Sequence, residues 1–384
     1  MTNTFFDFPV RRRFFGALPA FLLLFASVGM QNALGQRFID LRVARSDPGL
    51  SATFSPDGKT VVTDGDGVVQ IWDALSGREL RRLNAQSGFS QISPDGKTAV
   101  TTGDRIVQIR DAATGRELHK LTHTGFVFTA LFLPDGKRIM TLCDGAARVW
   151  DAESGRELQR LAQTEWVNQI VVSPDGTKIA TIGRMNDPVR IWDAESWREL
   201  RQFAGDSAAF SPDGKRIAIT GRDAAARGSI TRIWDVESGN KLHEWEGVFR
   251  TFSPDGKKVI TTSSEEYAAT SLPGTVRVAI SHIWDADSGR RLQRLEGRDA
   301  SFSPDGKKVA TLYETTTQIW DAASGRVLHS LSERGSVQSA DFSLDGKRVV
   351  TVAIPSGRLS VNERRTGNAS LAAMGALARI WILE

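Results

Sequence analysis

The chain has 384 residues, of which 40% are hydrophobic and 24% charged, an ordinary balance for a soluble globular protein. Its formal net charge of +4 is too small to indicate the clustered basic face of a nucleic-acid-binding protein. Cys143 is the single cysteine of the sequence, so the chain can form no internal disulfide and no cysteine-based zinc site.

The first 35 residues differ in composition from the rest and are typical of a targeting segment. Arg11–Arg13 precede an uncharged apolar run from Phe14 to Met30, and small residues stand at Ala33 and Gly35. The pattern predicts a signal peptide or an uncleaved N-terminal membrane anchor over residues 1–35. The run is shorter than the roughly 20 residues that a comfortable membrane span needs, which favours the signal peptide.

The arginine run also resembles a twin-arginine export motif. Val10 stands where the usual hydroxyl residue would be, and Gly16 where the usual lysine would be, so the Tat and Sec routes both stay open. On either route we expect an exported protein, periplasmic or extracellular, which meets the membrane only if the N-terminal segment is not cleaved.

An internal repeat dominates the remainder of the sequence. A Pro-Asp-Gly turn recurs at intervals of 38 to 50 residues, with Leu344 in place of proline in the last copy. Its aspartates are Asp57, Asp95, Asp135, Asp175, Asp213, Asp255, Asp305 and Asp345. Short runs of alternating apolar and polar residues flank each turn, as in Lys59–Thr63, and this period of two predicts the strands of a hairpin.

A second signature follows each turn. It is an apolar residue, then Trp-Asp, then a turn that usually ends in Ser-Gly, then a strand of the form Leu-x-x-Leu. Its tryptophans are Trp72, Trp150, Trp192, Trp234, Trp284, Trp320 and Trp381, with Arg110 in the second copy. A repeated residue usually serves the repeat, so we expect each tryptophan to pack between units and each aspartate to cap its local turn.

These eight registered copies resemble WD40 repeats of the bacterial Ser-Pro-Asp-Gly-Lys type over roughly residues 37–384. The resemblance implies an all-β fold, a single eight-bladed β-propeller over residues 36–384 with four-stranded antiparallel blades. The Gly-His dipeptide common in the family is absent, which puts the family's buried His–Asp network in doubt.

The strand count predicts how the ring closes. Eight copies of the first three strands are present, but only seven Leu-x-x-Leu strands follow a Trp-Asp, and the chain ends just past Trp381. Arg37–Ala44 is the one unassigned strand-like run. We expect it to pair with the last blade, because closure removes the exposed faces of an open array.

Little in the sequence points to catalysis. His119, His243 and His329 occupy one outer-strand position in three different blades, so we expect them to point outward and lie too far apart to bind a metal. Neither a catalytic triad nor a phosphate-binding loop can be placed. We expect no enzyme activity, cofactor or metal site.

The repeats depart from one another in the segment between the second and third strands. The distance from the turn glycine to the tryptophan position is 14 residues in blades 1, 2, 3 and 7, but 16, 20, 28 and 35 in blades 4, 5, 6 and 8. The resemblance implies that these loops open on the top face, and long loops on a rigid scaffold are the usual place for recognition. The candidate partner-binding residues are Arg222, Asp223 and Arg227 in blade 5, Glu265, Glu266 and Tyr267 in blade 6, and Arg358, Asn362, Glu363, Arg364 and Arg365 in blade 8.

Trp197 is a further candidate, on the opposite face. It replaces the turn glycine of blade 4, a position that requires a positive φ. Two interpretations are open: the turn changes type, or Trp197 is kept exposed for a contact.

Two classes of function follow. We expect a non-catalytic scaffold that binds a protein or peptide partner through the top-face loops of blades 5–8. The alternative is a secreted propeller enzyme, or a protein that binds a small molecule or glycan in the central channel. Polar or acidic groups converging from several blades on one pocket would favour the alternative.

Overall fold

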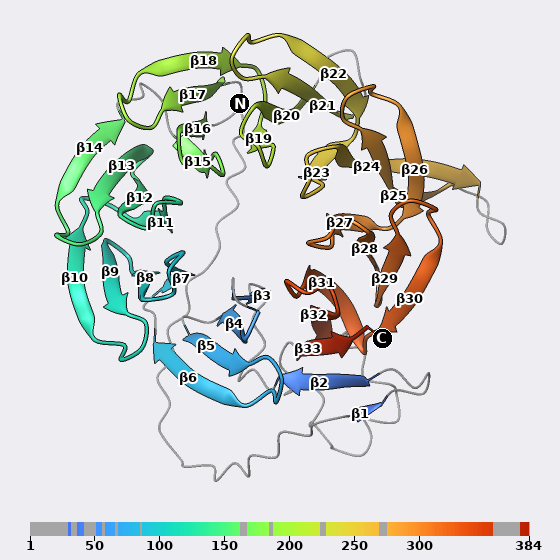
Figure 1. Ribbon diagram of the computed structural model, residues 1–384, viewed down its shortest axis with the longest axis horizontal. Helices are drawn as coiled ribbons and strands as arrows, with labels where there is room; N and C mark the ends of the chain where they lie inside the picture. The colour runs from blue at the N-terminus through green and yellow to red at the C-terminus, as the bar shows by residue number, and fades with distance from the viewer. Residues whose placement is uncertain are drawn as a thin grey trace, which may run out of the picture.

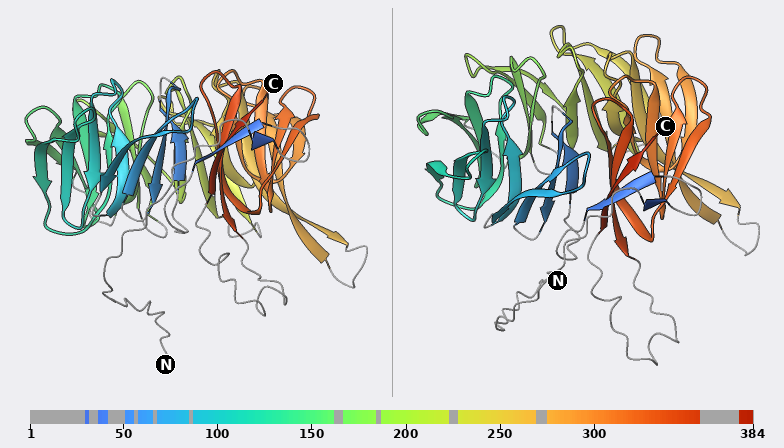
Figure 2. Two further views of the ribbon diagram at one scale, coloured as in Figure 1. Left: turned by 90° about the horizontal axis from the view of Figure 1, so that it is seen from below. Right: turned by 60° about the horizontal axis from the view of Figure 1, so that its bottom comes forward.

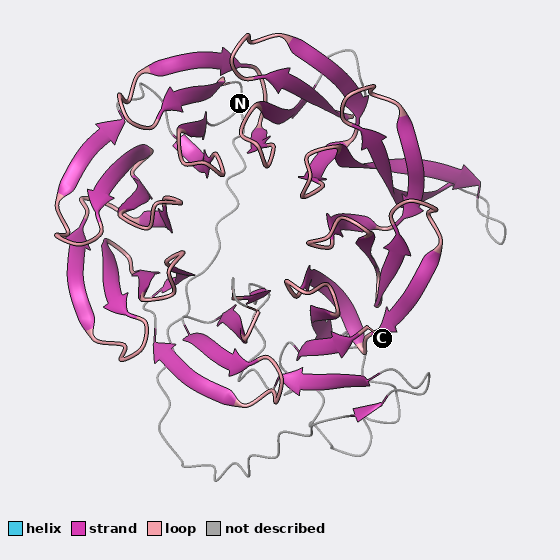
Figure 3. Ribbon diagram, viewed as in Figure 1, coloured by secondary structure: helices cyan, strands magenta, loops and turns pink. Residues whose placement is uncertain are grey.

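The computed structural model describes residues 30–31, 37–41, 51–55, 58–65, 68–84, 87–161, 167–183, 187–222, 228–268, 275–355 and 377–383. Eight β-sheets stand around a central opening, so the predicted eight-bladed propeller is confirmed (Figure 1). Within these ranges the chain forms strands and connecting turns and no helix (Figure 3). Accordingly, none of the described residues form a helix that could cross a membrane.

Seven blades are built from one continuous stretch of chain each, with strands in sequence order from the channel outward. Blade 1 holds β3 (Ser51–Phe54), β4 (Thr60–Gly65), β5 (Val68–Asp73) and β6 (Glu79–Asn84). Blade 2 holds β7 (Ser87–Ile92), β8 (Thr98–Thr102), β9 (Ile106–Asp111) and β10 (Glu117–Thr122). Blade 3 holds β11 (Val127–Phe132), β12 (Arg138–Cys143), β13 (Ala146–Asp151) and β14 (Glu157–Leu161). Blade 4 holds β15 (Val167–Val172), β16 (Lys178–Gly183), β17 (Val189–Asp193) and β18 (Glu199–Phe203).

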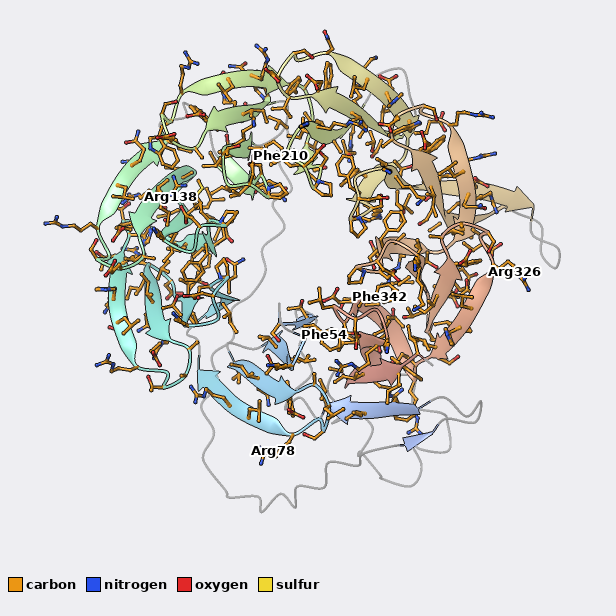
Figure 4. The ribbon with its side chains drawn as sticks, viewed as in Figure 1. Phe54, Arg78, Arg138, Phe210, Arg326 and Phe342 are labelled. Atoms are coloured by element: carbon orange, nitrogen blue, oxygen red, sulfur yellow. The ribbon has the colours of Figure 1, made fainter. Side chains whose placement is uncertain are left out.

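The second half of the ring continues the pattern. Blade 5 holds β19 (Ser207–Phe210), β20 (Arg216–Arg222), β21 (Ser229–Asp235) and β22 (Lys241–Glu246). Blade 6 holds β23 (Val248–Phe252), β24 (Lys258–Ala268), β25 (Thr275–Asp285) and β26 (Arg291–Glu296). Blade 7 holds β27 (Arg298–Phe302), β28 (Lys308–Tyr313), β29 (Thr316–Asp321) and β30 (Val327–Ser332). Phenylalanines of the inner strands lie near the opening and the arginines of the outer turns on the rim, as Phe54, Phe210, Arg78 and Arg326 show (Figure 4).

Blade 8 combines the two ends of the chain. It holds β31 (Gly335–Phe342), β32 (Arg348–Pro355) and β33 (Leu377–Ile382), and its outer strand is β2 (Arg37–Leu41), antiparallel to β33. The predicted closure by the N-terminal strand is therefore confirmed. The sequence did not predict the short β1 (Met30–Gln31), which pairs with β2 and makes this a five-stranded sheet.

The Ser-Pro-Asp-Gly-Lys turn is stabilised by its own side chains. In blade 2 the Ser93 hydroxyl donates to Asp95 Oδ1 at 2.6 Å, and the N–H of Lys97 donates to the same oxygen at 3.0 Å. The hydroxyl bond holds the pKa of Asp95 below its ordinary value. Gly96 completes the turn at a φ of +73°, a conformation that glycine adopts at little cost.

The tryptophans pack between blades, as expected. Trp150 of blade 3 is buried against Val100 and Ile109 of blade 2, and its indole N–H donates to Thr141 Oγ1 at 2.8 Å. The same bond joins tryptophan and threonine in blades 1, 4, 6, 7 and 8. The following aspartate caps its turn, because Asp151 Oδ1 accepts bonds from both the N–H and the hydroxyl of Ser154.

The closing strand is fixed by a buried ion pair. The Arg379 guanidinium lies 2.6 Å from a carboxylate oxygen of Glu333, whose side chain is fully buried. The other oxygen of Glu333 accepts from Thr351 at 2.5 Å and from the Trp381 indole at 3.0 Å. Phe38 of β2 covers this group, with its ring centroid 4.2 Å from the guanidinium carbon. The N-terminal strand is thus held by ring packing over a charged, hydrogen-bonded centre.

The histidine positions differ from the expectation. His119 and His243 do not point outward but lie half-buried against the turn of the next blade. A Cβ added to Gly289 would lie 2.6 Å from the His243 ring, and one added to Gly155 would lie 3.2 Å from that of His119. The turn glycines therefore provide space for the preceding blade as well as a positive φ.

Candidate functional site

The top face is defined here as the face that carries the connection between the second and third strand of each blade. Of the predicted residues in blade 5, Arg222 is exposed and ends β20, opposite Ser229. Asp223 and Arg227 fall outside the described residues. So do the five blade 8 candidates, Arg358, Asn362, Glu363, Arg364 and Arg365.

The blade 6 candidates correct the sequence prediction. Glu265, Glu266 and Tyr267 were expected in a loop, but they belong to β24, which runs on to Ala268. The ladder with β25 continues without interruption from Lys258↔Asp285 to Ala268↔Thr275. Threonine, valine and isoleucine favour extended backbone, and they recur in β25, so the inserted residues lengthen the hairpin instead of forming a loop.

The lengthened hairpin leaves the body of the propeller. In Figure 1 its end extends past the outer edge of the ring, and in Figure 2 it projects beyond the disc. β24 and β25 have 11 residues each, whereas the corresponding strands of blade 7 have six. Blade 6 therefore presents a two-stranded ribbon where blade 7 has a tight turn.

Charged groups fix the base of this hairpin. The Glu265 carboxylate lies 2.8 Å from the Arg294 guanidinium of β26 and 3.5 Å from His282 Nε2. His282 is buried, and this burial, reinforced by nearby Arg291, lowers its pKa although Glu265 acts in the opposite direction. Glu265 thus connects the hairpin to the outer strand of its own blade.

Trp197 follows neither of the two interpretations that the sequence left open. The turn keeps its type, since the Trp197 N–H donates to Asp193 O at 2.9 Å just as the turn glycines do elsewhere, and φ is +59°. The ring is half-buried against the core between blades 3 and 4, with the Arg138 guanidinium carbon 6.0 Å from its centroid. Trp197 therefore covers the seam between two blades and is not held out for a contact.

Comparison with known proteins identifies the repeat in two segments of the chain. The family model described as WD domain, G-beta repeat matches residues 49–73 and 115–151, which include the Trp-Asp pairs of blades 1 and 3. These two segments of the chain are therefore WD40 repeats. WD40 propellers generally act as modules for protein–protein interaction.

A solved structure has a similar fold. Kuenenia stuttgartiensis Hydrazine Synthase is similar at a TM-score of 0.50 and 18% identity, over 68% of this chain and 91% of that chain. At this identity the likeness concerns the fold alone. Among curated proteins no match is found.

An aromatic pair that the sequence pattern did not single out lies on the top face of the propeller. Phe126 and Phe128, beside the start of β11, are 46% and 54% exposed, and their ring centroids lie 5.2 Å apart. The N–H of Val127 between them donates to Asp104 O of blade 2, which fixes the backbone. The departure of Phe-Val-Phe from the other repeats at this position was the available signal.

A partial form of the family's buried network also escaped the sequence reading. His123 is buried, and its Nε2 lies 2.9 Å from the Thr141 hydroxyl that accepts the Trp150 indole bond. Burial lowers the pKa of His123, with Arg148 acting in the same direction. The histidine follows a threonine here instead of a glycine, so the dipeptide pattern did not reveal it.

Polar groups of the inner strands connect blades to one another. Asp341 of blade 8 accepts a bond from the Thr53 hydroxyl of blade 1 at 3.0 Å, and its burial raises its pKa. Asp299 of blade 7 lies 2.7 Å from Arg250 of blade 6 and 2.6 Å from neighbouring Arg298. These groups pair across seams rather than converging on one pocket.

Two surface hollows lie at the outside of the ring. Their volumes are about 630 and 560 Å³, and both flank Arg201 at the seam between blades 4 and 5. No three histidine, cysteine, aspartate or glutamate side chains in the described ranges are grouped so that they could hold a metal ion.

Proposed function

We propose that this WD40 propeller is a non-catalytic scaffold that binds a protein or peptide through the top face of blades 5–8 after export from the cytoplasm. The observation that carries the proposal is the asymmetry of that face. Blades 2, 3 and 7 keep short connections there, while blade 6 extends a hairpin whose two strands have 11 residues each. Projecting elements on a rigid ring can contact a partner without disturbing the core.

Affinity capture from the native envelope, read by mass spectrometry, tests the proposal. The intact protein is compared with a trimmed variant in which Ser264–Ala279 becomes Asn-Gly and residues 356–373 become a short glycine linker. Asn-Gly suits the trimmed hairpin because Ser263 and Ile280 face each other in register. We expect a partner that the intact protein retains and the trimmed protein loses.

Trp197→Gly serves as the matched control, because it alters the opposite face. It should retain the partner. Similar melting temperatures would show that the trimmed protein is folded. If the intact and trimmed proteins then capture the partner equally, the top-face proposal is wrong. Cell fractionation and sequencing of the mature N-terminus test the export part separately, and a cytoplasmic protein with an intact N-terminus contradicts it.

A further inference from the structure

The larger of the two hollows at the seam between blades 4 and 5 is basic and aromatic. Arg201 of β18 and Arg232 of β21 line it from the two blades, and none of the described residues that line it is acidic. Phe203 and Trp234 supply aromatic surface to the same hollow, with their ring centroids 4.8 Å apart. The hollow therefore offers positive charge beside aromatic rings.

The arginine pair sets this seam apart from the other seven. Arg201 occupies the outer-strand position that pairs with the aliphatic residue before the tryptophan, and Arg232 lies two residues before the tryptophan of the next blade. From blade 1 to blade 8 the outer-strand position holds Arg81, His119, Gln159, Arg201, His243, Gln293, His329 and Ile39. In the same order the third-strand position holds Gln70, Gln108, Arg148, Arg190, Arg232, His282, Gln318 and Arg379. Only the seam between blades 4 and 5 thus takes an arginine from both of its blades.

The charge of Arg201 is not balanced by an acidic side chain. Its exposed guanidinium donates to the backbone carbonyl oxygen of Glu237 in the next blade, and no described carboxylate lies within ion-pairing distance of it. Arg232, by contrast, is paired with Glu244, whose carboxylate oxygen lies 2.8 Å from Nε. Arg201 is therefore the group of this hollow that can accept an anion.

The second hollow continues on the other side of Arg201. Lys178, Arg198, Glu199 and Glu237 line it, and Glu199 already belongs to an ion pair within blade 4. The two cations therefore face one remaining carboxylate, that of Glu237. Two hollows of this size that meet at one side chain suit an extended segment better than a single small ion.

We propose that this seam binds an acidic segment of a partner protein. A glutamate or aspartate carboxylate of the segment pairs with Arg201, whose planar guanidinium can hold a carboxylate through two parallel N–H bonds. An adjoining apolar side chain packs on Phe203 and Trp234, and the segment crosses Arg201 into the second hollow. The site lies at the outside of the ring, so the inference goes beyond the proposed top-face function and does not depend on it.

The test uses the full chain and a labelled six-residue peptide of alternating leucine and glutamate, with a leucine–glutamine peptide as the charge control. We expect saturable binding of the glutamate peptide with a dissociation constant below about 1 mM. The glutamine peptide should bind at least about fivefold more weakly. No saturable binding of the glutamate peptide by the intact protein overturns the proposal.

Two matched variants test the role of Arg201. Arg201→Gln removes the charge but keeps the seam, because Gln293 holds the same position in blade 6 and donates from Nε2 to Ala323 O. It should weaken binding of the glutamate peptide at least about fivefold at an unchanged melting temperature. Arg81→Gln is the control, since Arg81 holds this position in blade 1 and bonds to Ala112 O at 2.8 Å. It should leave binding unchanged.

Three outcomes contradict the proposal. Equal weakening by Arg201→Gln and Arg81→Gln would mean that the peptide is attracted to the basic surface in general. Displacement of the peptide by free glutarate at the concentration of the peptide itself would identify a site for a small anion. Sedimentation that shows self-association lost in Arg201→Gln would identify a second copy as the occupant.

The trimmed top-face variant separates this inference from the proposed function. It lacks the blade 6 hairpin but keeps both hollows, so it should bind the glutamate peptide as tightly as the intact protein does. If the envelope partner is captured equally by the intact and trimmed proteins, the proposed function fails while this inference stands.

Discussion

Blades 7 and 8 are neighbours in the ring but close their sheets in different ways. Blade 7 comes from one continuous stretch, and its Trp320 indole bonds to Thr311. Blade 8 joins the two ends of the chain, and its Trp381 indole bonds to both Thr351 and Glu333, with Arg379 paired to the same carboxylate. Where the chain does not continue through the blade, a charged centre and Phe38 hold the sheet together.

Removing Arg379 should have the largest effect. Arg379→Gln gives blade 8 the residue that blade 7 has at Gln318, but it leaves Glu333 buried without its cation. Such a loss costs about 3–5 kcal/mol of unfolding free energy. Urea unfolding measures it.

The double variant Glu333→Gln/Arg379→Gln provides the control. It should recover most of the lost stability, since a neutral pair avoids an uncompensated buried charge. A single variant that loses less than about 1 kcal/mol would show that the pair does not lock the closure.

The tryptophan–threonine bond is the next test of the comparison. Thr311→Val in blade 7 leaves the Trp320 indole without its acceptor and should cost about 1–3 kcal/mol. The exposed Thr315→Val, four residues away, should change stability by less than about 0.5 kcal/mol. Equal costs for the two variants would contradict a structural role for the bond.

Two buried histidines extend the comparison to pH. His123 and His282 have pKa values lowered by burial, so the unfolded chain binds their protons more readily than the folded chain does. Keeping these two histidines neutral stabilises the folded state fully above the ordinary histidine pKa. This stabilisation is lost as the pH falls below about 6.5.

Melting temperatures between pH 5 and 8 measure this effect. The double variant His123→Gln/His282→Gln should show a flatter profile than the intact protein below pH 6.5. An unchanged slope would mean that other groups carry the dependence.

Trp197→Gly should have the smallest effect. It releases about 1–2 kcal/mol of strain from a residue at positive φ, but it removes the ring that packs beside Arg138. The two terms oppose each other, so we expect a net change below about 1 kcal/mol in the unfolding free energy. A loss of 3 kcal/mol would show that the seam between blades 3 and 4 depends on this ring.

Repeated residues made the fold predictable, and single departures from the repeat did not. The Pro-Asp-Gly turns and Trp-Asp pairs recur with fixed spacing, so they located every blade and the closing strand. The prediction of a loop in blade 6 rested on the length of the insertion alone. It did not use the alternating β-branched residues of the insertion, which favour a strand. The Glu333–Arg379 pair joins residues 46 positions apart, and no local pattern connects them. The burial of the Trp197 ring was not predicted, because the ring packs against residues of blade 3 that lie far away in the sequence.

The closing strand also sets an order of events during synthesis. β2 is made near the start of the chain, yet its partner β33 comes more than three hundred residues later. At about 5–20 residues per second, that interval is roughly 20–70 s. During this interval the ring cannot close, and the side of blade 1 that packs against blade 8 in the finished ring has no neighbour. The protein therefore passes through an unclosed stage, and Phe38 cannot pack against Arg379 and Trp381 until β33 has been made.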